Sequence, residues 1–365
     1  MITETKIKYF GSKITDLIKG KNLSRQETKM LFIDILLNKQ PEIQQGAFLA
    51  ALAAKGEIAE EIAGAWEAIY ELDTVKIELE TNEPILENCG TGMDELKTFN
   101  ISTASAIVGA SGGLYIAKHG ARAITSKCGT IDILEKLGID VECDINIIKK
   151  SIEECGIGIF NGMSPKIHPT ALFRILSKIR FGTILNISAS LANPVLPKYA
   201  LRGVYSENLV ELVAKVMREI GYKKAMVVCG LDINNKSMDE LSTLGKTIIC
   251  ELKETGKIEK YTIEPEDVGL KRAKYELLCP NENIEEEVKQ FLKIIIGKEK
   301  GPKYDIVCLN TAPLFYIMGK VKNLQDGIEK ARELIETGKA IEKLQQWVVK
   351  QNRNYCKNIE KCLVK

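Results

Sequence analysis

Residues 87–138 constrain the fold of this chain more than any other part of the sequence. Just before them, the apolar pair Ile85-Leu86 leads toward Cys89-Gly90-Thr91-Gly92, which predicts a buried strand that ends in a glycine loop. Such a loop lets the backbone turn sharply and approach a ligand, although a GxG sequence alone is common without one. Whether this loop binds a ligand depends on the polar residues that the neighbouring segments place beside it.

The segment after the loop has the polar side chains that an anion would need. Asn100, Ser102 and Thr103 stand at the start of the small apolar run 104–110, which predicts a helix. The hydroxyl groups and the first free backbone amides of that helix point the same way. We therefore expect a phosphate cradle at this helix start.

Two further segments extend the cradle. Residues 114–117 predict a second buried strand, which delivers Lys118-His119-Gly120 to the same carboxyl edge of a parallel sheet. Residues 125–130 form a hydroxyl-rich turn before the amphipathic helix 131–137. Two helix starts and a lysine suit a ligand with two separate phosphate groups.

Together these segments resemble one known family. The matching stretches are GTGMDELKTFNIST (90–103), AKHGAR (117–122) and CGTIDILEKLG (128–138). They are similar to the GTGGD, TFNIST, KHGNR and DxLExLG pattern of anthranilate phosphoribosyltransferases. The resemblance implies magnesium-dependent transfer of phosphoribose from phosphoribosyl pyrophosphate to the nitrogen of an aromatic amine, with anthranilate as the first candidate and tryptophan biosynthesis as the pathway. It also implies a homodimer formed through a helical domain.

The resemblance assigns donor and metal contacts residue by residue. The donor contacts are Gly90, Thr91, Gly92, Asp94, Thr98, Asn100, Ser102, Thr103, Lys118 and Cys128, of which Cys128 stands where the family tends to have serine. Asp239-Glu240 matches a magnesium-binding DE pair, in a loop that is three residues longer. With Ser102 this pair would hold Mg²⁺, with two ions expected, because magnesium prefers carboxylates and ligand phosphates. No covalent nucleophile is needed, because positioning and charge neutralisation suffice.

The acceptor side departs from the family pattern. Ala121 replaces the asparagine of KHGN. In the donor loop, Met93 replaces a glycine of GTGGD and puts a side chain where a glycine backbone could bend freely, which bears on donor affinity. The family's carboxylate-binding arginine falls in a rewritten, shortened segment. We expect the acceptor contacts to come from His119, Ala121, His168, Arg174, Lys178 and Arg180, without a choice among the three cations. For each histidine a structural hydrogen bond is the alternative role.

The fold expected is α/β, with a small N-terminal helical domain and a larger domain built on a mainly parallel sheet. The helical domain is predicted over residues 1–80, joined by helices from about 168–181, and the α/β domain over 84–365. Within the first, Ser24 and Glu27 predict a capping box, Pro41 opens a helix that closes near Gly56, and another helix follows from Ile58 to Leu72.

Apolar runs predict the remaining strands and helices. Strands are expected at 157–160, 182–188 and 225–230, and a hairpin at 247–252 and 258–263. One helix is expected to end at about Met318. Two amphipathic helices are expected after it, over 324–337 and 340–349, with a break between them at Gly338.

Composition favours an enzyme in a reducing compartment. The net charge of +2 gives no reason to expect nucleic acid or a membrane surface as partner, and no apolar run is long enough to span a bilayer. The ten cysteines are scattered without CxxC spacing, which predicts free thiols and a cytoplasmic location.

Three alternatives stay open. A paralogous phosphoribosyltransferase with another aromatic or heterocyclic acceptor shares the donor residues. A pyrimidine nucleoside phosphorylase is the second, because Gly129-Thr130-Ile131-Asp132 with Leu134-Glu135 echoes its GTxDKLE pattern. A non-catalytic relative that binds nucleic acid is the third, on the strength of the basic tail Lys350, Arg353, Lys357, Lys361 and Lys365.

Overall fold

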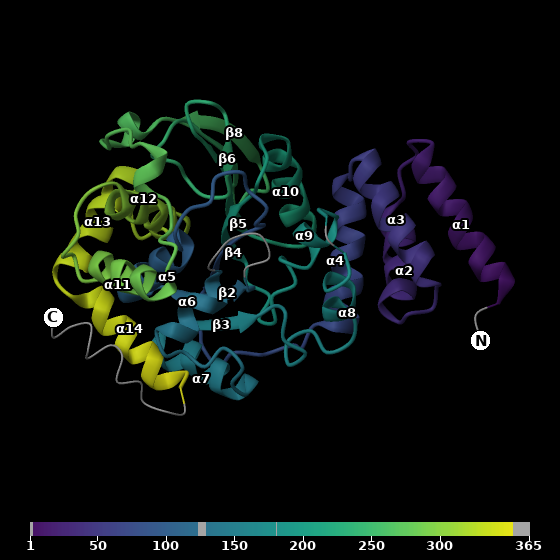
Figure 1. The fold of residues 1–365 in the computed structure, drawn as a ribbon, viewed down its shortest axis with the longest axis horizontal. Helices are drawn as coiled ribbons and strands as arrows, with labels where there is room; N and C mark the ends of the chain where they lie inside the picture. Colours follow the sequence, from purple (N-terminus) through teal and green to yellow (C-terminus); the bar gives the residue numbers. More distant parts are fainter. Residues whose placement is uncertain (1–2, 123–128, 180, 353–365) are drawn as a thin grey trace.

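The computed structural model describes residues 3–122, 129–179 and 181–352. They form an elongated molecule, with a bundle of helices at the N-terminal end and a larger α/β body that contains the C-terminal helices (Figure 1). This arrangement confirms the predicted fold class. In the described part of the chain, no helix is long and apolar enough to cross a membrane.

The helical bundle contains four long helices and one short return segment. Their bounds are α1 (Glu4–Ile18), α2 (Arg25–Leu36), α3 (Glu42–Lys55), α4 (Ala59–Asp73) and α8 (Leu172–Leu176). The Ser24 capping box is present, with Ser24 Oγ accepting from the Glu27 amide and the Glu27 carboxylate accepting from the Ser24 amide. Pro41 and Gly56 flank α3 as expected, whereas α1 was not predicted as a separate helix.

One apolar core joins the bundle to the body. The rings of Phe10 and Phe32 pack on Phe48, at centroid distances of 5.2 and 5.9 Å. Leu172 and Ile175 of α8 belong to the same core, which continues to the near face of the sheet. Burial of this kind contributes about 25 cal/mol per Å² of apolar surface.

The body is built on an eight-stranded sheet. Its order is β3-β2-β1-β4-β5-β7-β8, with β6 paired to β5. Strands β3, β2, β1, β4 and β5 run parallel, β6 and β7 each pair antiparallel with β5, and β8 pairs antiparallel with β7. The bounds are β1 (Ile85–Gly90), β2 (Tyr115–Gly120), β3 (Ile157–Asn161), β4 (Tyr199–Gly203), β5 (Lys224–Leu231), β6 (Ser237–Met238), β7 (Thr247–Leu252) and β8 (Ile258–Ile263).

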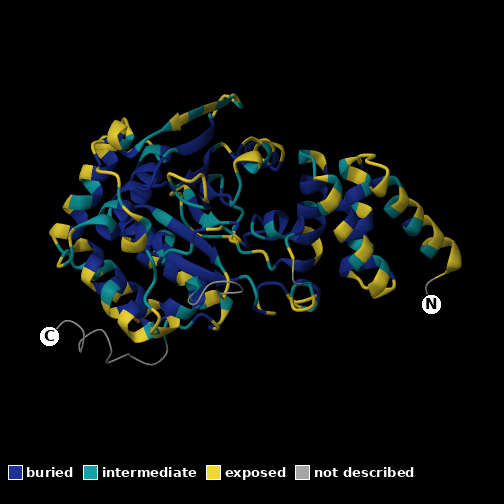
Figure 2. Cartoon of the chain, turned by 45° about the horizontal axis from the view of Figure 1, so that its top comes forward, coloured by how far each residue is buried: buried dark blue, intermediate teal, exposed yellow. Residues whose placement is uncertain are grey.

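Helices cover both faces of this sheet, so its strands are largely buried except the edge strand β8, whose residues are half-buried or exposed (Figure 2). Alternate residues point to opposite faces. Leu201 and Met226 pack with the C-terminal helices, whereas Ala200 and Val227 face α10 and the bundle. The body helices are α5 (Ile101–Ser111), α6 (Thr130–Lys136), α7 (Ile145–Cys155), α9 (Leu185–Ser188), α10 (Glu207–Glu219), α11 (Ile284–Ile295), α12 (Pro302–Ile317), α13 (Leu324–Glu336) and α14 (Lys339–Lys350).

The strand predicted over 182–188 is wrong, because the segment turns into the short helix α9. The Asn186 side chain accepts a hydrogen bond from the Thr183 amide at 2.9 Å, and Thr183 Oγ1 accepts one from the Leu185 amide at 3.3 Å. These side-chain hydrogen bonds stabilise a turn, which is incompatible with an extended strand at this place. The hairpin β7–β8 and the break at Gly338 are confirmed.

Candidate active site

Two parallel neighbours, β1 and β2, bring the lysine to the helix start. Their carboxyl ends meet at one edge, where Lys118 Nζ donates to the carbonyl oxygen of Asn88 at 2.8 Å and to Ser102 Oγ at 3.1 Å. The Asn88 side chain in turn donates to the backbone oxygen of Ser102 at 2.9 Å. A buried lysine is thus fixed against the first turn of α5, beside its free amides.

The glycine loop after β1 is held by hydrogen bonds at both ends. The Thr91 amide donates to Gly203 O at 3.0 Å, and the Gly92 amide donates to Asp239 Oδ2 at 2.7 Å. Gly92 has φ +67°, in the left-handed region that glycine adopts at little cost. Further on, the amides of Glu95 and Leu96 donate to Ser237 O, which anchors the loop to β6. The loop is therefore ordered against the strand that precedes the acidic pair.

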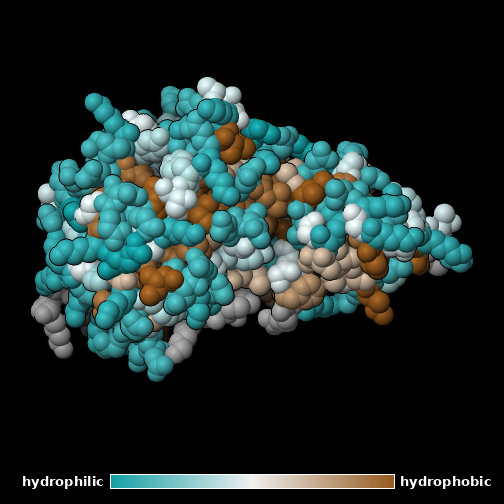
Figure 3. Space-filling model, turned by 90° about the horizontal axis from the view of Figure 1, so that it is seen from above, coloured by the Kyte–Doolittle hydropathy of each residue, from teal (hydrophilic) through white to brown (hydrophobic). Residues whose placement is uncertain are grey.

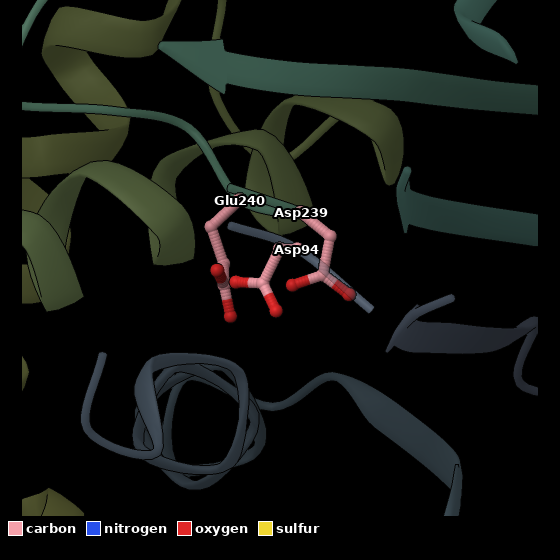
Figure 4. Close-up of side chains that lie close together, drawn as sticks. All are labelled: Asp94, Asp239 and Glu240. Atoms are coloured by element: carbon pink, nitrogen blue, oxygen red, sulfur yellow. The ribbon is translucent and has the colours of Figure 1, made fainter. Parts of the chain in front are cut away.

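Three carboxylates converge at this point. One oxygen from each of Asp94, Asp239 and Glu240 lies within 4.8 Å of the others. Figure 4 shows the three side chains extending in one direction with their carboxylates side by side, although Asp94 comes from a different segment. From the sequence, Asp94 was assigned to the donor, and Asp239 and Glu240 were assigned to the metal together with Ser102. Its distance along the chain from the pair gave no signal of this contact.

Three glycines at the ends of neighbouring strands make room for the acidic pair. A Cβ on Gly90 would lie 2.0 Å from Asp239 Oδ2, and one on Gly203 would lie 1.5 Å from Asp239 O. On Gly230 it would lie 2.4 Å from Glu240 O. Side chains at these positions would displace the pair. Gly203 and Gly230 were not predicted from the sequence, where a glycine at the end of an apolar run is the available signal.

The cluster carries negative charge that the protein compensates only in part. Burial, followed by the neighbouring Asp239, raises the pKa of Glu240 well above its usual value, and the same causes raise the pKa of Asp94 to about 7. The positive charge of Lys118 acts in the opposite direction on Glu240. Oε2 of Glu240 is buried and has no hydrogen-bond partner among the described residues.

These features fit a magnesium ion. The donor set consists of oxygens only, which Mg²⁺ prefers, and a divalent cation would satisfy the unpartnered oxygen and relieve the repulsion between the carboxylates. Lys118 connects these carboxylates with Ser102, because its ammonium donates to Ser102 Oγ and interacts electrostatically with Glu240. A ligand phosphate between Ser102 and the carboxylates would complete the coordination.

The remaining donor candidates line the same region. Asn100 is the N-cap of α5, Thr103 Oγ1 is buried and has no hydrogen-bond partner in the described chain, and Thr98 is half-buried in the loop before the helix. Cys128 lies outside the described residues.

A buried pair of histidines marks the border between body and bundle. His168 Nδ1 lies 2.6 Å from the backbone oxygen of Asp73, and so carries a proton. Its Nε2 lies 3.4 Å from His119 Nε2, and His119 Nδ1 lies 3.4 Å from Ser190 O. Both rings are nearly inaccessible, so the hydrogen-bonding role predicted as the alternative is present in the structure.

A buried ion pair supports the same face of the sheet. Arg202 Nη2 lies 2.6 Å from Glu87 Oε2, and both side chains are fully buried. Glu87 also accepts from Asn193 Nδ2 at 2.9 Å and from Tyr222 OH at 3.2 Å, while Arg202 Nη2 donates to Ser190 O at 3.3 Å. The network links β1 and β4 to the segment that contacts His119. No sequence motif predicted it.

Comparison with known proteins identifies the family. Residues 82–341 match the family described as "Glycosyl transferase family, a/b domain", and residues 12–72 match "Glycosyl transferase family, helical bundle domain". The anthranilate phosphoribosyltransferase of Petrotoga mobilis is 38% identical over 341 residues, which is 93% of this chain and 96% of the relative. The chain belongs to the anthranilate phosphoribosyltransferase family.

Solved structures of the anthranilate phosphoribosyltransferase family agree with this assignment. The enzyme from Thermus thermophilus superposes with a TM-score of 0.82 at 32% identity, covering 93% of this chain and 98% of that one. The Saccharomyces cerevisiae enzyme, solved in complex with PRPP and Mg, gives 0.80 at 26% identity, with coverage of 96% and 98%.

Two of the three cations expected to contact the acceptor, Arg174 and Lys178, instead contact the helical bundle. Lys178 Nζ lies 2.6 Å from Glu42 Oε1, and Arg174 donates to Ile35 O at 2.8 Å and to Gln45 Oε1 at 3.3 Å. Ala121 is exposed at the end of β2, and Arg180 lies outside the described residues. The structure therefore does not bring Arg174 and Lys178 into the donor cluster, and they would have to exchange partners to hold a carboxylate.

The histidine pair predicts a pH-dependent stability. Burial, then the charge of His168, lowers the pKa of His119 to about 3, and burial also lowers the pKa of His168. Arg202 from β4 and Lys118 from its own strand disfavour the charged form too. The unfolded chain therefore takes up these protons near pH 6.5, and the folded chain only at lower pH. The stability that these two neutral histidines contribute is fully present above pH 6.5 and is lost as the pH falls toward 3.

We expect His119→Gln to weaken this dependence. Between pH 7 and pH 5 the wild type should lose about 2 kcal/mol more of its unfolding free energy than the variant, since one histidine titrates only in the unfolded state. Urea unfolding at pH 7, 6 and 5 measures the difference. Parallel curves for the two proteins would contradict the assignment of a buried neutral His119.

Proposed function

We propose that this protein is a magnesium-dependent phosphoribosyltransferase that transfers the phosphoribosyl group of phosphoribosyl pyrophosphate to the amino group of anthranilate, a step of tryptophan biosynthesis. The observation that carries the proposal is the convergence of Lys118, the start of α5 and the three carboxylates at one sheet edge. A cationic contact, free helix amides and a metal-binding cluster are what a sugar with phosphate at both ends requires.

The donor would be bound mainly by its phosphates. Ser102, Thr103 and the amides of α5 would bind one phosphate group, with Lys118 neutralising part of its charge. Thr91, Gly92 and Asp94 would lie along the pyrophosphate and ribose, with Gly90, Thr98 and Asn100 shaping the loop. Cys128 is retained as a proposed donor contact on the resemblance alone.

Asp239, Glu240 and Ser102 would hold magnesium, with Asp94 as a further ligand and two ions as the proposed number. Bound magnesium supplies positive charge that stabilises the departing pyrophosphate. The ribose C1 develops positive charge as its bond to pyrophosphate breaks, and the amine nitrogen bonds to C1 from the opposite side and releases one proton to water. The chain's own contribution is to align donor and acceptor and to keep the leaving group neutralised.

The acceptor would enter between body and bundle. His119 and His168 would form part of its wall, with Ala121 near the entrance and Arg174, Lys178 or Arg180 for the carboxylate. A paralogous enzyme with another aromatic or heterocyclic acceptor is the second candidate. It is supported by the pairing of Lys178 with Glu42 and of Arg174 with Ile35 O, which leaves both cations engaged.

We also propose a cytoplasmic homodimer formed through the bundle. Apolar side chains are exposed on α1, α2 and α3, including Ile18, Met30 and Ile43, of which Ile43 is 87% exposed. Burying them against a second copy would be favourable.

Of the basic tail, Lys350 forms an ion pair with Glu154, and the residues from 353 onward lie outside the described part of the chain.

Donor binding provides the first test. Calorimetry with phosphoribosyl pyrophosphate and Mg²⁺ should show binding, and Lys118→Met should weaken it by roughly 10- to 100-fold, because one hydrogen-bonded charge is lost. Lys150→Met, which changes an exposed lysine on α7, is the control and should bind normally. Absence of wild-type binding would refute the proposal.

Turnover tests the acceptor. Anthranilate fluorescence should fall as product forms when donor and Mg²⁺ are present. A flat trace beside proven donor binding would favour the second candidate.

A further inference from the structure

Met93 occupies an unusual backbone conformation at the centre of the donor loop. Its φ is +67°, in the left-handed region that residues with a Cβ seldom adopt. Both neighbours are fixed: the Gly92 amide donates to Asp239, and Lys97 Nζ donates to Asp94 O at 2.6 Å and to its Oδ1 at 3.2 Å. The loop therefore holds Met93 in a strained state, which is typical of functional sites.

The side chain of Met93 reaches a segment that is distant in sequence. A Cβ built on Gly182 would lie 3.2 Å from Met93 Cε and 3.4 Å from Met93 Sδ, so the thioether packs directly on that glycine. Gly182 lies in the connection between α8 and α9. Met93 thus links the loop that carries Asp94 to the chain that returns from the bundle.

That connection is linked to two residues proposed as acceptor contacts, Lys178 and His119. It follows Lys178, which pairs with Glu42 of the bundle, and it leads through α9 to Ser190, whose carbonyl contacts His119. Met93 keeps 39% of its surface exposed, so part of the side chain is available to a bound molecule. In Figure 3, apolar residues are visible in the central part of the hydrophilic face, between the bundle end and the body.

We propose that Met93 is a specificity-determining residue, whose thioether forms a wall between the donor cradle and the acceptor and limits the size of the aromatic amine that can reach the ribose C1. This inference rests on the proposed transferase function and extends it to the selection of the acceptor. A flexible, polarisable thioether on a glycine suits contact with an aromatic ring. Its removal should enlarge the acceptor space without touching the metal-binding carboxylates.

Two substitutions at Met93 separate the effect of its side chain from the effect of its backbone strain. Met93→Gly removes the thioether and suits the left-handed conformation, so its thermal stability should equal or exceed that of the wild type. Met93→Ala removes the same atoms beyond Cβ and keeps the strain, so it should unfold at a lower temperature. Both variants should show the same change in acceptor selectivity, because both lack the wall.

The measurement compares kcat/KM for anthranilate and for 4-methyl- and 4-phenylanthranilate. Both variants should raise the ratio of the larger acceptors to anthranilate by roughly 10-fold or more, as expected when a pocket wall of this size is removed. The calorimetric Kd for phosphoribosyl pyrophosphate with Mg²⁺ is measured for each variant, and the donor is kept saturating so that a change in its affinity does not enter the acceptor ratio. An unchanged acceptor ratio in both variants, with donor binding intact, would overturn the proposal for Met93 alone.

Gly182→Ala provides a matched test from the other side of the contact. Its methyl group would push against Met93 Cε, so it should alter acceptor selectivity in the wild type and have no effect in the Met93→Gly background. Additive effects would overturn the proposed contact. Failure of the wild type to bind the donor would instead count against the transferase function, and calorimetry detects this before any variant is compared.

Discussion

Replacing Glu240 by glutamine should lower kcat/KM for phosphoribosyl pyrophosphate by roughly 10²- to 10³-fold, the range for loss of one group that stabilises developing charge. Glutamine keeps the shape of the side chain but removes the charge that a metal needs. Its stability effect should have the opposite sign. Without magnesium, burial beside Asp239 makes the ionised carboxylate unfavourable, so the variant should unfold at a higher temperature than the wild type.

Steady-state kinetics and thermal unfolding without magnesium measure the two effects. Glu219→Gln, on an exposed glutamate at the end of α10, is the control and should change neither quantity appreciably. A Glu240→Gln variant with normal kinetics would exclude this carboxylate from the metal site. A variant that loses both activity and stability would indicate a structural role instead.

Replacing Arg202 by methionine should lower the unfolding free energy by about 3–5 kcal/mol, because Glu87 would remain buried without its partner. Chemical denaturation measures the loss. In a double-mutant cycle with Glu87→Met, the second substitution should cost much less in the Arg202→Met background than in the wild type. Additive losses would mean that the two charges contribute independently.

Arg218→Met is the matched control for this prediction. Arg218 lies 3.4 Å from Glu219, and both side chains are more than 40% exposed. Solvent screens such a pair, so the change should stay within about 0.5 kcal/mol. An equal loss in both variants would contradict the importance of burial at Arg202.

The contact between Lys118 and the start of α5 could be predicted from the sequence because its residues are close together in the chain. A glycine loop, hydroxyl groups at a helix start and a lysine at the end of the next strand meet wherever parallel strands are neighbours. Lys118 and Ser102 are in contact as a result. The parallel sheet, the capping box at Ser24 and the β7–β8 hairpin followed from local patterns in the same way.

Long-range contacts could not be predicted. Asp94 lies beside Asp239 and Glu240 because hydrogen bonds anchor its loop to β6. Arg202 contacts Glu87 because β1 and β4 are paired, and no sequence motif predicts that pairing. The run 182–188 was misassigned because a short apolar segment suits a buried strand and a buried helix equally. The partners of Lys178 and Arg174 lie on the bundle, whose docking the sequence does not encode locally.

The three strand-end glycines have a consequence for how this enzyme could change over evolutionary time. Main-chain atoms of Asp239 and Glu240 rest directly on Gly203 and Gly230, and the Asp239 carboxylate rests on Gly90, so single substitutions there cannot be absorbed gradually. On the proposed acceptor side, the residues are a thioether and long cationic side chains, which tolerate exchange one at a time. Substitutions that lead to new acceptors should therefore accumulate on that side, while the metal-binding carboxylates and the glycines beneath them stay unchanged.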